Sequence, residues 1–197
     1  MTGSGGAMGG PAVGLWLSEE RSALDAVPWL DSFCEVRASD GCLEFHVREP
    51  LALGLGRLSP GPFHLGLESL EDFQALGFPG IDRPPAVELA LVAYRSGQDD
   101  HLLLGHLALF LAERFDALIN FYGLLGYRFS LDDLSEKEEA ARLIEARALV
   151  TSLPGHISET QYAMAQGGHW YSHIGDREFL TAWLRHPEFH MIWEIKP

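Results

Sequence analysis

The spacing of apolar residues along the chain predicts a series of short strands. In Cys42–Val47, the apolar residues Leu43, Phe45 and Val47 alternate with polar ones, as in a strand with one buried face. Val87–Tyr94 is an almost continuous apolar run, which indicates a strand buried on both faces. The same criteria predict five further strands, at Pro11–Leu17, Leu118–Tyr122, Thr160–Ala165, His169–Ile174 and Phe189–Ile195.

Other stretches repeat their apolar residues every three to four positions and predict helices. Ser135 followed by Glu138 matches a capping box and predicts a helix within Asp132–Val150. Gln98-Asp99-Asp100 offers an N-cap for a helix that runs to about Phe115. Three shorter helices are predicted, at Leu24–Phe33 with a break at Pro28, at Leu70–Leu76 up to Gly77, and from Asp176 to Pro187.

Glycine and proline mark the connections. Ser39-Asp40-Gly41 predicts a turn, and Gln166-Gly167-Gly168 predicts the loop of a β-hairpin. Leu51–Gly66 is rich in both residues and predicts a loop or an irregular strand. Together these elements predict one α+β domain over residues 11–197, with helices packed on a mixed or mostly antiparallel sheet. The Gly-rich residues 1–10 predict a flexible tail.

The charge of the chain narrows the choice of partners. Its 197 residues include 28 acidic and 14 basic ones, which gives a net charge of -14. Such a field repels phosphate backbones and anionic membrane surfaces, so we expect no nucleic-acid or membrane partner. It speeds association with a basic protein, although acidity can also serve solubility alone.

Two observations favour the cytoplasm. The N-terminus has neither the basic segment nor the apolar segment of a signal peptide, and the longest apolar stretch, His101–Ala112, is too short to span a bilayer. The two cysteines, Cys34 and Cys42, do not form a CxxC motif and are predicted to be reduced, small apolar residues of the core.

Histidines are the first place to look for chemistry. His169, His173, Asp176 and His186 lie close together in the sequence, and a small hydrolase-like enzyme could use them. His169 and His173 are four residues apart on a predicted strand, which separates them by roughly 13 Å and is too far for one metal ion. The chain also lacks G-x-S-x-G and phosphate-loop motifs. We therefore expect no catalytic residue, no metal and no cofactor.

Acidic residues form two candidate partner-binding surfaces. The first surface consists of Asp132, Asp133, Glu136, Glu138 and Glu139, and the second of Asp99 and Asp100. Both lie where helices are predicted to begin, so the carboxylates could simply favour the positive end of a helix dipole. The alternative is that they bind Arg and Lys side chains of a partner.

The last third of the chain carries distinctive strings of residues, namely Leu153-Pro154-Gly155, His169–Asp176 and Ala182–Pro187. With His101–Ala112 upstream, these strings resemble a bacterial family of unknown function, DUF6368. The resemblance implies no activity, cofactor or site residue.

Small, acidic α+β proteins of this kind also resemble immunity proteins of polymorphic toxin systems. We therefore predict an immunity-type inhibitor that binds a cognate toxin domain with a basic, nucleic-acid-directed surface. The alternatives are the hydrolase-like enzyme and a non-catalytic scaffold or regulatory protein.

Overall fold

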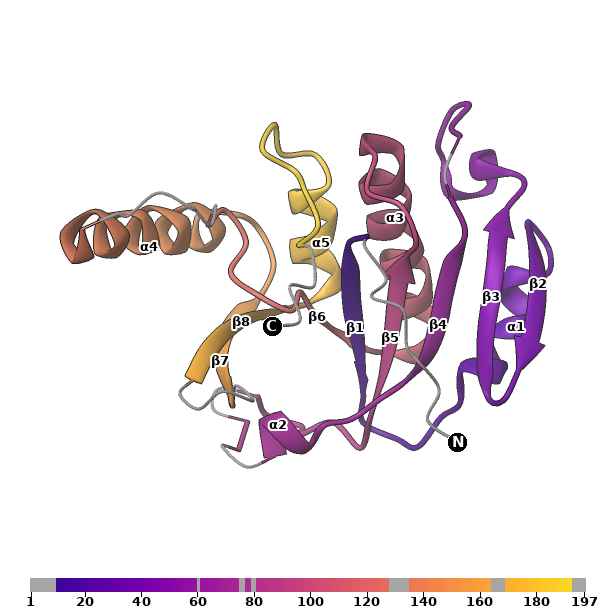
Figure 1. Cartoon of the computed structure of the whole chain (residues 1–197), viewed down its shortest axis with the longest axis horizontal. Helices are drawn as coiled ribbons and strands as arrows, with labels where there is room; N and C mark the ends of the chain where they lie inside the picture. The colour runs from indigo at the N-terminus through magenta and orange to yellow at the C-terminus, as the bar shows by residue number, and fades with distance from the viewer. Residues whose placement is uncertain are drawn as a thin grey trace.

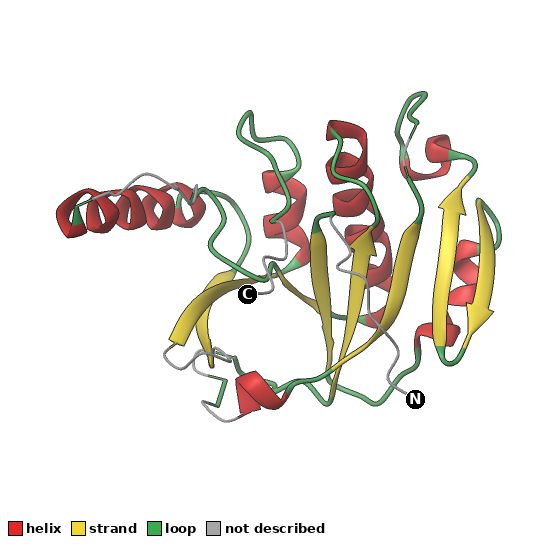
Figure 2. Cartoon of the chain, viewed as in Figure 1, coloured by secondary structure: helices red, strands yellow, loops and turns green. Residues whose placement is uncertain are grey.

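The fold is an eight-stranded sheet, and the helices α3 (Gln98–Phe115) and α5 (Arg177–Trp183) cover one of its faces (Figures 1 and 2). The computed structural model describes residues 10–59, 61–74, 77–78, 81–127, 135–163 and 169–192. The strands are β1 (Ala12–Leu17), β2 (Cys34–Ser39), β3 (Cys42–Val47), β4 (Phe63–Glu68), β5 (Val87–Ala93), β6 (Leu118–Asn120), β7 (Ile157–Ala163) and β8 (His169–Gly175).

The strands follow the order β2-β3-β4-β5-β1-β6-β8-β7, and every neighbouring pair is antiparallel. The first strand of the chain therefore lies in the middle of the sheet, between β5 and β6. The predicted single α+β domain with a mostly antiparallel sheet is confirmed. The predicted flexible tail concerns residues 1–10, and of these residues 1–9 lie outside the described part of the chain.

The helices differ greatly in length. They are η1 (Ala23–Ala26), α1 (Val27–Leu30), η2 (Pro50–Leu53), α2 (Glu71–Gln74), α3 (Gln98–Phe115), α4 (Glu136–Thr151) and α5 (Arg177–Trp183). Helix α3 packs against β1, β5 and α5, and forms the main layer on the sheet. Helix α4 instead projects from the end of the molecule beyond α5 (Figure 1).

Side chains of the central strands alternate between two faces of the sheet. Val13, Leu15 and Leu17 of β1 point to the face that α3 and α5 cover, where they join the main core. We call this the helix face. Trp16 lies on the opposite face, with its ring centroid 5.1 Å from that of Phe73 of α2. Both faces of β1 and β5 are thus buried, as the apolar run of β5 predicts.

Three strands differ from the predictions. The first is β2, which was not predicted because its exposed side chains leave little alternation to read. The second is β4, whose first residues end the glycine-rich stretch that was predicted as a loop or an irregular strand. The third concerns Phe189–Ile192, which forms no strand: Met191 N–H donates to His101 Nδ1 at 3.1 Å, and the Ile192 carbonyl accepts from Ala12 at 3.2 Å. Residues 193–195 of that prediction lie outside the described part.

Helix boundaries differ from the predictions by a few residues. Pro28 does not break a helix, because it lies in the first turn of α1, where proline is tolerated. Helix α3 is capped by Gly97, one residue earlier than predicted, and the Gly97 N–H donates to Asp100 at 2.9 Å. The capping box of Ser135 and Glu138 on α4 is confirmed, and so is the cap of Asp176 on α5.

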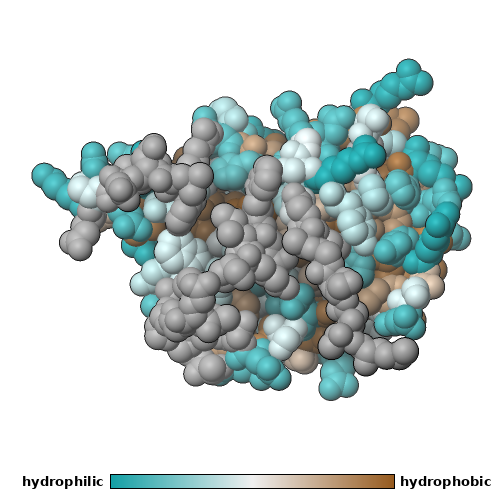
Figure 3. Space-filling view, viewed as in Figure 1, coloured by the Kyte–Doolittle hydropathy of each residue, from teal (hydrophilic) through white to brown (hydrophobic). Residues whose placement is uncertain are grey.

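The space-filling view shows hydrophilic side chains along α4 and over the opposite end of the molecule (Figure 3). Among the described residues, no helix is both long and apolar enough to cross a membrane.

Gly14 gives the first test of the central packing. A Cβ added there would lie 1.9 Å from Glu88 Oε1, so we expect Gly14→Ala to destabilise the fold by about 1–3 kcal/mol. Gly56 is the matched control, because it is exposed and no atom lies within 4 Å of a Cβ built on it. Urea unfolding of both variants measures the difference. Equal unfolding free energies for the two variants would contradict the packing described.

Candidate functional site

The described acidic residues of the first predicted surface lie at the start of α4. Asp132 and Asp133 are outside the described part of the chain, and of Glu136 only the backbone is described. Glu138 is exposed, and its Oε2 accepts hydrogen bonds from Ser135 N–H at 3.0 Å and Ser135 Oγ at 2.6 Å. These bonds lower the pKa of Glu138, so the carboxylate is charged. Glu139 follows it in the same turn and lies beside Tyr127, whose pKa is raised by burial and by this carboxylate.

A single bidentate ion pair fixes α4 to the sheet. Arg147 Nε and Nη2 each donate to the Glu159 carboxylate of β7 at 2.8 Å. The Arg147 guanidinium also lies over the Tyr171 ring, 5.4 Å from its centroid. Planar, bidentate pairs of this kind fix both distance and orientation. The pair therefore determines the angle at which α4 leaves the body of the protein.

Few other side chains of α4 are buried. Ala146 and Val150, in its second half, pack against the protein. Ile144, by contrast, is 66% exposed. Helix α4 thus presents the charged Glu138 carboxylate in its first turn and an apolar side chain about two turns further on.

The second predicted surface has a structural role. Asp99 accepts a hydrogen bond from Ser59 N–H at 3.0 Å, and Asp100 accepts one from Gly61 N–H at 2.7 Å. Asp100 is only 4% exposed, so its carboxylate is not accessible to a partner. These two residues hold the loop before β4 against the start of α3, and we leave Asp100 out of the binding surface.

The described members of the predicted His/Asp set do not converge. Asp176 accepts hydrogen bonds from Phe179 N–H and His156 N–H at 2.7 and 3.0 Å, as the cap of α5. His186 lies beyond the other end of α5, where it stacks on Trp183. The side chain of His169 is outside the described part. Among the described residues, no group of three or more His, Cys, Asp or Glu side chains could hold a metal ion.

His173, the fourth member, is buried in the interior. Its Nδ1 accepts the Leu125 N–H at 3.0 Å, and its Nε2 lies 3.9 Å from Glu159 Oε2. Burial, helped by the positive charge of Arg147, lowers the pKa of His173 to about 4, although the Glu159 carboxylate acts in the opposite direction. The ring is therefore neutral near pH 7, and it tethers the chain after β6 to β8.

A buried polar cluster that was not predicted lies at the centre of the sheet. Glu88 of β5 is 0% exposed, and its Oε1 accepts from Asn120 Nδ2 of β6 at 2.8 Å. Strand β1 separates these two strands, and the bond crosses it where Gly14 has no side chain. Asn120 Oδ1 accepts in turn from Ser172 Oγ of β8 at 2.6 Å. One network of side chains therefore links β5, β6 and β8 across the opposite face.

Burial dominates the chemistry of Glu88. It raises the pKa of this carboxyl to about 7, although the Asn120 amide, the Trp16 indole and the Tyr122 hydroxyl around it act in the opposite direction. Glu88 Oε2 and Trp16 Nε1 are buried, and neither has a hydrogen-bond partner of ordinary geometry among the described residues. Tyr122 adopts a left-handed backbone conformation with φ of 57°. Strain and a perturbed acid together are often seen at functional sites.

Sequence reasoning missed this cluster because Glu88 stands in a strongly apolar strand. The signal that could have found it is that same contrast: a glutamate in VELALVAY must be either exposed or partnered. The partner, Asn120, is 32 positions away and cannot be inferred from spacing.

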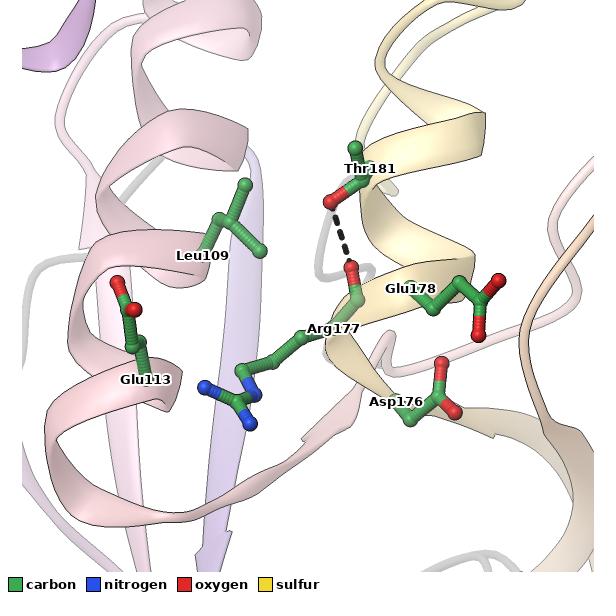
Figure 4. A pocket seen from close by; sticks show the side chains of 6 residues that line it. All are labelled: Leu109, Glu113, Asp176, Arg177, Glu178 and Thr181. Carbon is green, nitrogen blue, oxygen red and sulfur yellow. Dashed lines mark hydrogen bonds between the residues drawn. The ribbon is translucent and has the colours of Figure 1, made fainter.

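A shallow groove between α3 and α5 has a polar lining (Figure 4). Arg177 of α5 points toward Glu113 of α3, and Thr181 Oγ1 donates to the Arg177 carbonyl at 2.7 Å. Since Asp176 is committed to capping α5, the lining offers no nucleophile and base in contact.

The comparisons with known proteins identify a family without assigning a function. The family described as "Family of unknown function (DUF6368)" matches residues 9–193. No curated protein and no solved structure matches the chain.

The stability of the protein should depend on the protonation of Glu88. Because its pKa is raised in the folded state, the folded protein loses stability as pH rises from about 4.5 through about 7, by up to about 3 kcal/mol. We expect Glu88→Gln to remove this loss. Chemical denaturation between pH 5 and pH 8 measures the unfolding free energy of both proteins. If the two free energies change with pH in the same way, Glu88 is not the group responsible.

Protonation of His173 should have the opposite effect on stability, which it lowers as the pH falls. Because its folded pKa is lowered to about 4, the folded protein loses stability as pH falls from about 6.5 through about 4. His173→Asn keeps an acceptor for Leu125 N–H and removes the titration. The variant should lose up to about 3 kcal/mol less than the wild type on acidification. If the variant and the wild type lose the same unfolding free energy on acidification, His173 is not the titrating group.

Proposed function

Since the chain belongs to the DUF6368 family, whose function is unknown, we propose a function from its structure. We propose that it is a binding protein of the immunity type, which neutralises a cognate toxin domain by covering a basic, nucleic-acid-directed surface. Its binding surface is the exposed part of α4.

The observation that carries the proposal is the way α4 is presented. A helix that served only the core would bury an apolar stripe along its whole length. Helix α4 buries side chains near its second half and is fixed there by Arg147 and Glu159. Its first turns remain available, with Glu138 charged and Ile144 exposed. A binding hot spot usually combines an apolar anchor with a polar rim, and α4 carries both along its length.

Net charge supports a basic partner. The value of -14 steers a positively charged protein toward this chain and raises association rates by roughly 10–10³ at low salt. Toxins that act on nucleic acids carry Arg and Lys surfaces for phosphate. Carboxylates on a projecting helix can occupy the same positions as those phosphates.

The site chemistry favours binding over catalysis. The described members of the His/Asp set cap a helix, tether a strand and stack on a tryptophan, and so act in different places. Glu88 is enclosed, without the exposure that a substrate would need.

We also propose a cytoplasmic location. Both cysteines are free thiols, and Cys34 is buried with a pKa raised to about 12. Such thiols are stable in a reducing compartment.

The deciding experiment is co-expression with the product of the neighbouring gene. We expect that product to be toxic alone and harmless together with this protein. A harmless neighbour, or one that stays toxic in the presence of this protein, would refute the immunity function. Binding to a basic neighbour that is not a toxin would favour a scaffold or regulatory protein instead.

Neutral variants test the surface itself. Glu136→Gln/Glu138→Gln/Glu139→Gln keeps helix-forming residues and a glutamine that can complete the capping box, but removes three charges. We expect association with the toxin to slow at least about tenfold at low salt. The control Glu19→Gln/Glu20→Gln/Glu113→Gln removes the same charge from exposed positions elsewhere. Surface plasmon resonance measures the association rates of both variants. If the two variants slow association equally, the binding surface is not on α4.

Ile144→Asp tests the apolar anchor. Because Ile144 is 66% exposed, the change should leave the unfolding free energy within about 0.5 kcal/mol of the wild type. We expect it to raise the dissociation rate of the complex at least about tenfold, since central apolar anchors act on dissociation. Unchanged dissociation would exclude Ile144 from the interface.

A further inference from the structure

The sheet ends in an exposed strand at the end remote from α4. Strand β2 is the outermost strand next to β3, at the border of the molecule (Figure 1). Among the described residues, β3 is the only strand that pairs with it. An edge strand of this kind presents unpaired N–H and C=O groups to other chains.

The register of the β2–β3 hairpin identifies these groups. Asp40 and Gly41 form a two-residue turn with φ of 50° and 82°, so Ser39 and Cys42 are a hydrogen-bonded pair. Every second residue of β2 then directs its backbone N–H and C=O groups to β3. The N–H and C=O groups of the residues between, Val36 and Ala38, point away from β3. Further back, the Cys34 carbonyl accepts from Arg48 Nη2 at 2.9 Å, which closes that end of the edge.

The open part of β2 lacks the devices that usually block pairing. It contains no lysine, no proline and no bulge. Its only charges are Glu35 and Arg37, one of each sign, which form an exposed ion pair at 3.5 Å with side chains 58% and 80% exposed on the same side of the strand. Charges of a single sign would repel a second copy, whereas this pair complements itself.

We propose that β2 pairs antiparallel with β2 of a second copy, around a twofold axis at Val36. In this register, Val36 exchanges two hydrogen bonds with its counterpart. Glu35 then lies opposite the second copy's Arg37, and Arg37 opposite its Glu35. The two sheets become one continuous sheet.

Other registers do not place Glu35 opposite Arg37 of the second copy. An axis at Arg37 places the two Arg37 side chains opposite each other, which is destabilising. An axis at Ala38 places Arg37 opposite Ser39 and forms no ion pair. The alternation of charge along β2 thus selects the register centred on Val36.

The dimer would be weak and would leave α4 free. The contact is one strand wide, so we expect a Kd of roughly 10–1000 µM. Helix α4 lies at the far end of the sheet, and a dimer would present both copies of it at opposite ends (Figure 1). The inference is independent of the proposed function.

Charge exchange tests the pairing. Light scattering and sedimentation over increasing concentration should show the mass rising from 21.8 kDa toward twice that value. Glu35→Arg and Arg37→Glu each place like charges opposite each other, and each should raise the Kd at least about tenfold. The double variant Glu35→Arg/Arg37→Glu restores opposite charges and should restore the dimer. Arg21→Glu, an equal charge change at another exposed position, should have little effect.

Three results would overturn the inference. One is a monomer at every concentration up to about 1 mM. Another is a dimer that neither single variant weakens, which would place the contact on another surface. The third is a double variant that folds, as circular dichroism shows, but remains as monomeric as the single variants.

Discussion

The hydrogen bond from Asn120 to Glu88 holds together the centre of the sheet, on which the other elements depend. It spans β1, and it can do so only because Gly14 leaves room above that strand. A buried carboxyl costs free energy unless it is partnered or protonated, and this one is both partnered and close to neutral. The stability of this polar centre therefore depends on the Asn120–Glu88 hydrogen bond and on the protonation of Glu88.

From this centre, polar contacts continue to the projecting helix. Asn120 bonds to Ser172 of β8, and the neighbouring His173 bonds to Leu125 and approaches Glu159. Glu159 in turn fixes Arg147 of α4. The direct pairing of β6 with β8 covers two residue pairs, and two backbone hydrogen bonds extend it, from Phe121 N–H to the His173 carbonyl and from His173 N–H to the Gly123 carbonyl. The position of α4 thus depends on these polar contacts together with the burial of Ala146 and Val150.

Local patterns predicted the elements whose chemistry is local. The alternation in β3, the apolar run of β5 and the cap of Ser135 and Glu138 all depend on neighbours within a few residues. The missed features depend on distant ones: β2 buries little of itself, and Glu88 finds its partner only after the chain has folded. The acidic residues were predicted as two similar surfaces. Distant backbone partners give Asp100 a buried role that its sequence does not reveal.

The central place of β1 has a consequence for the order of assembly during synthesis. This strand leaves the ribosome well before its partners β5 and β6, which follow about 70 and 100 residues later. The β2–β3 hairpin and β4 can pair while β1 still waits with both edges open. Contacts between distant parts of a chain slow folding, and an unpaired apolar strand exposes the nascent protein to aggregation in the meantime. Strand β1 can therefore be enclosed on both edges only after β6 has been made.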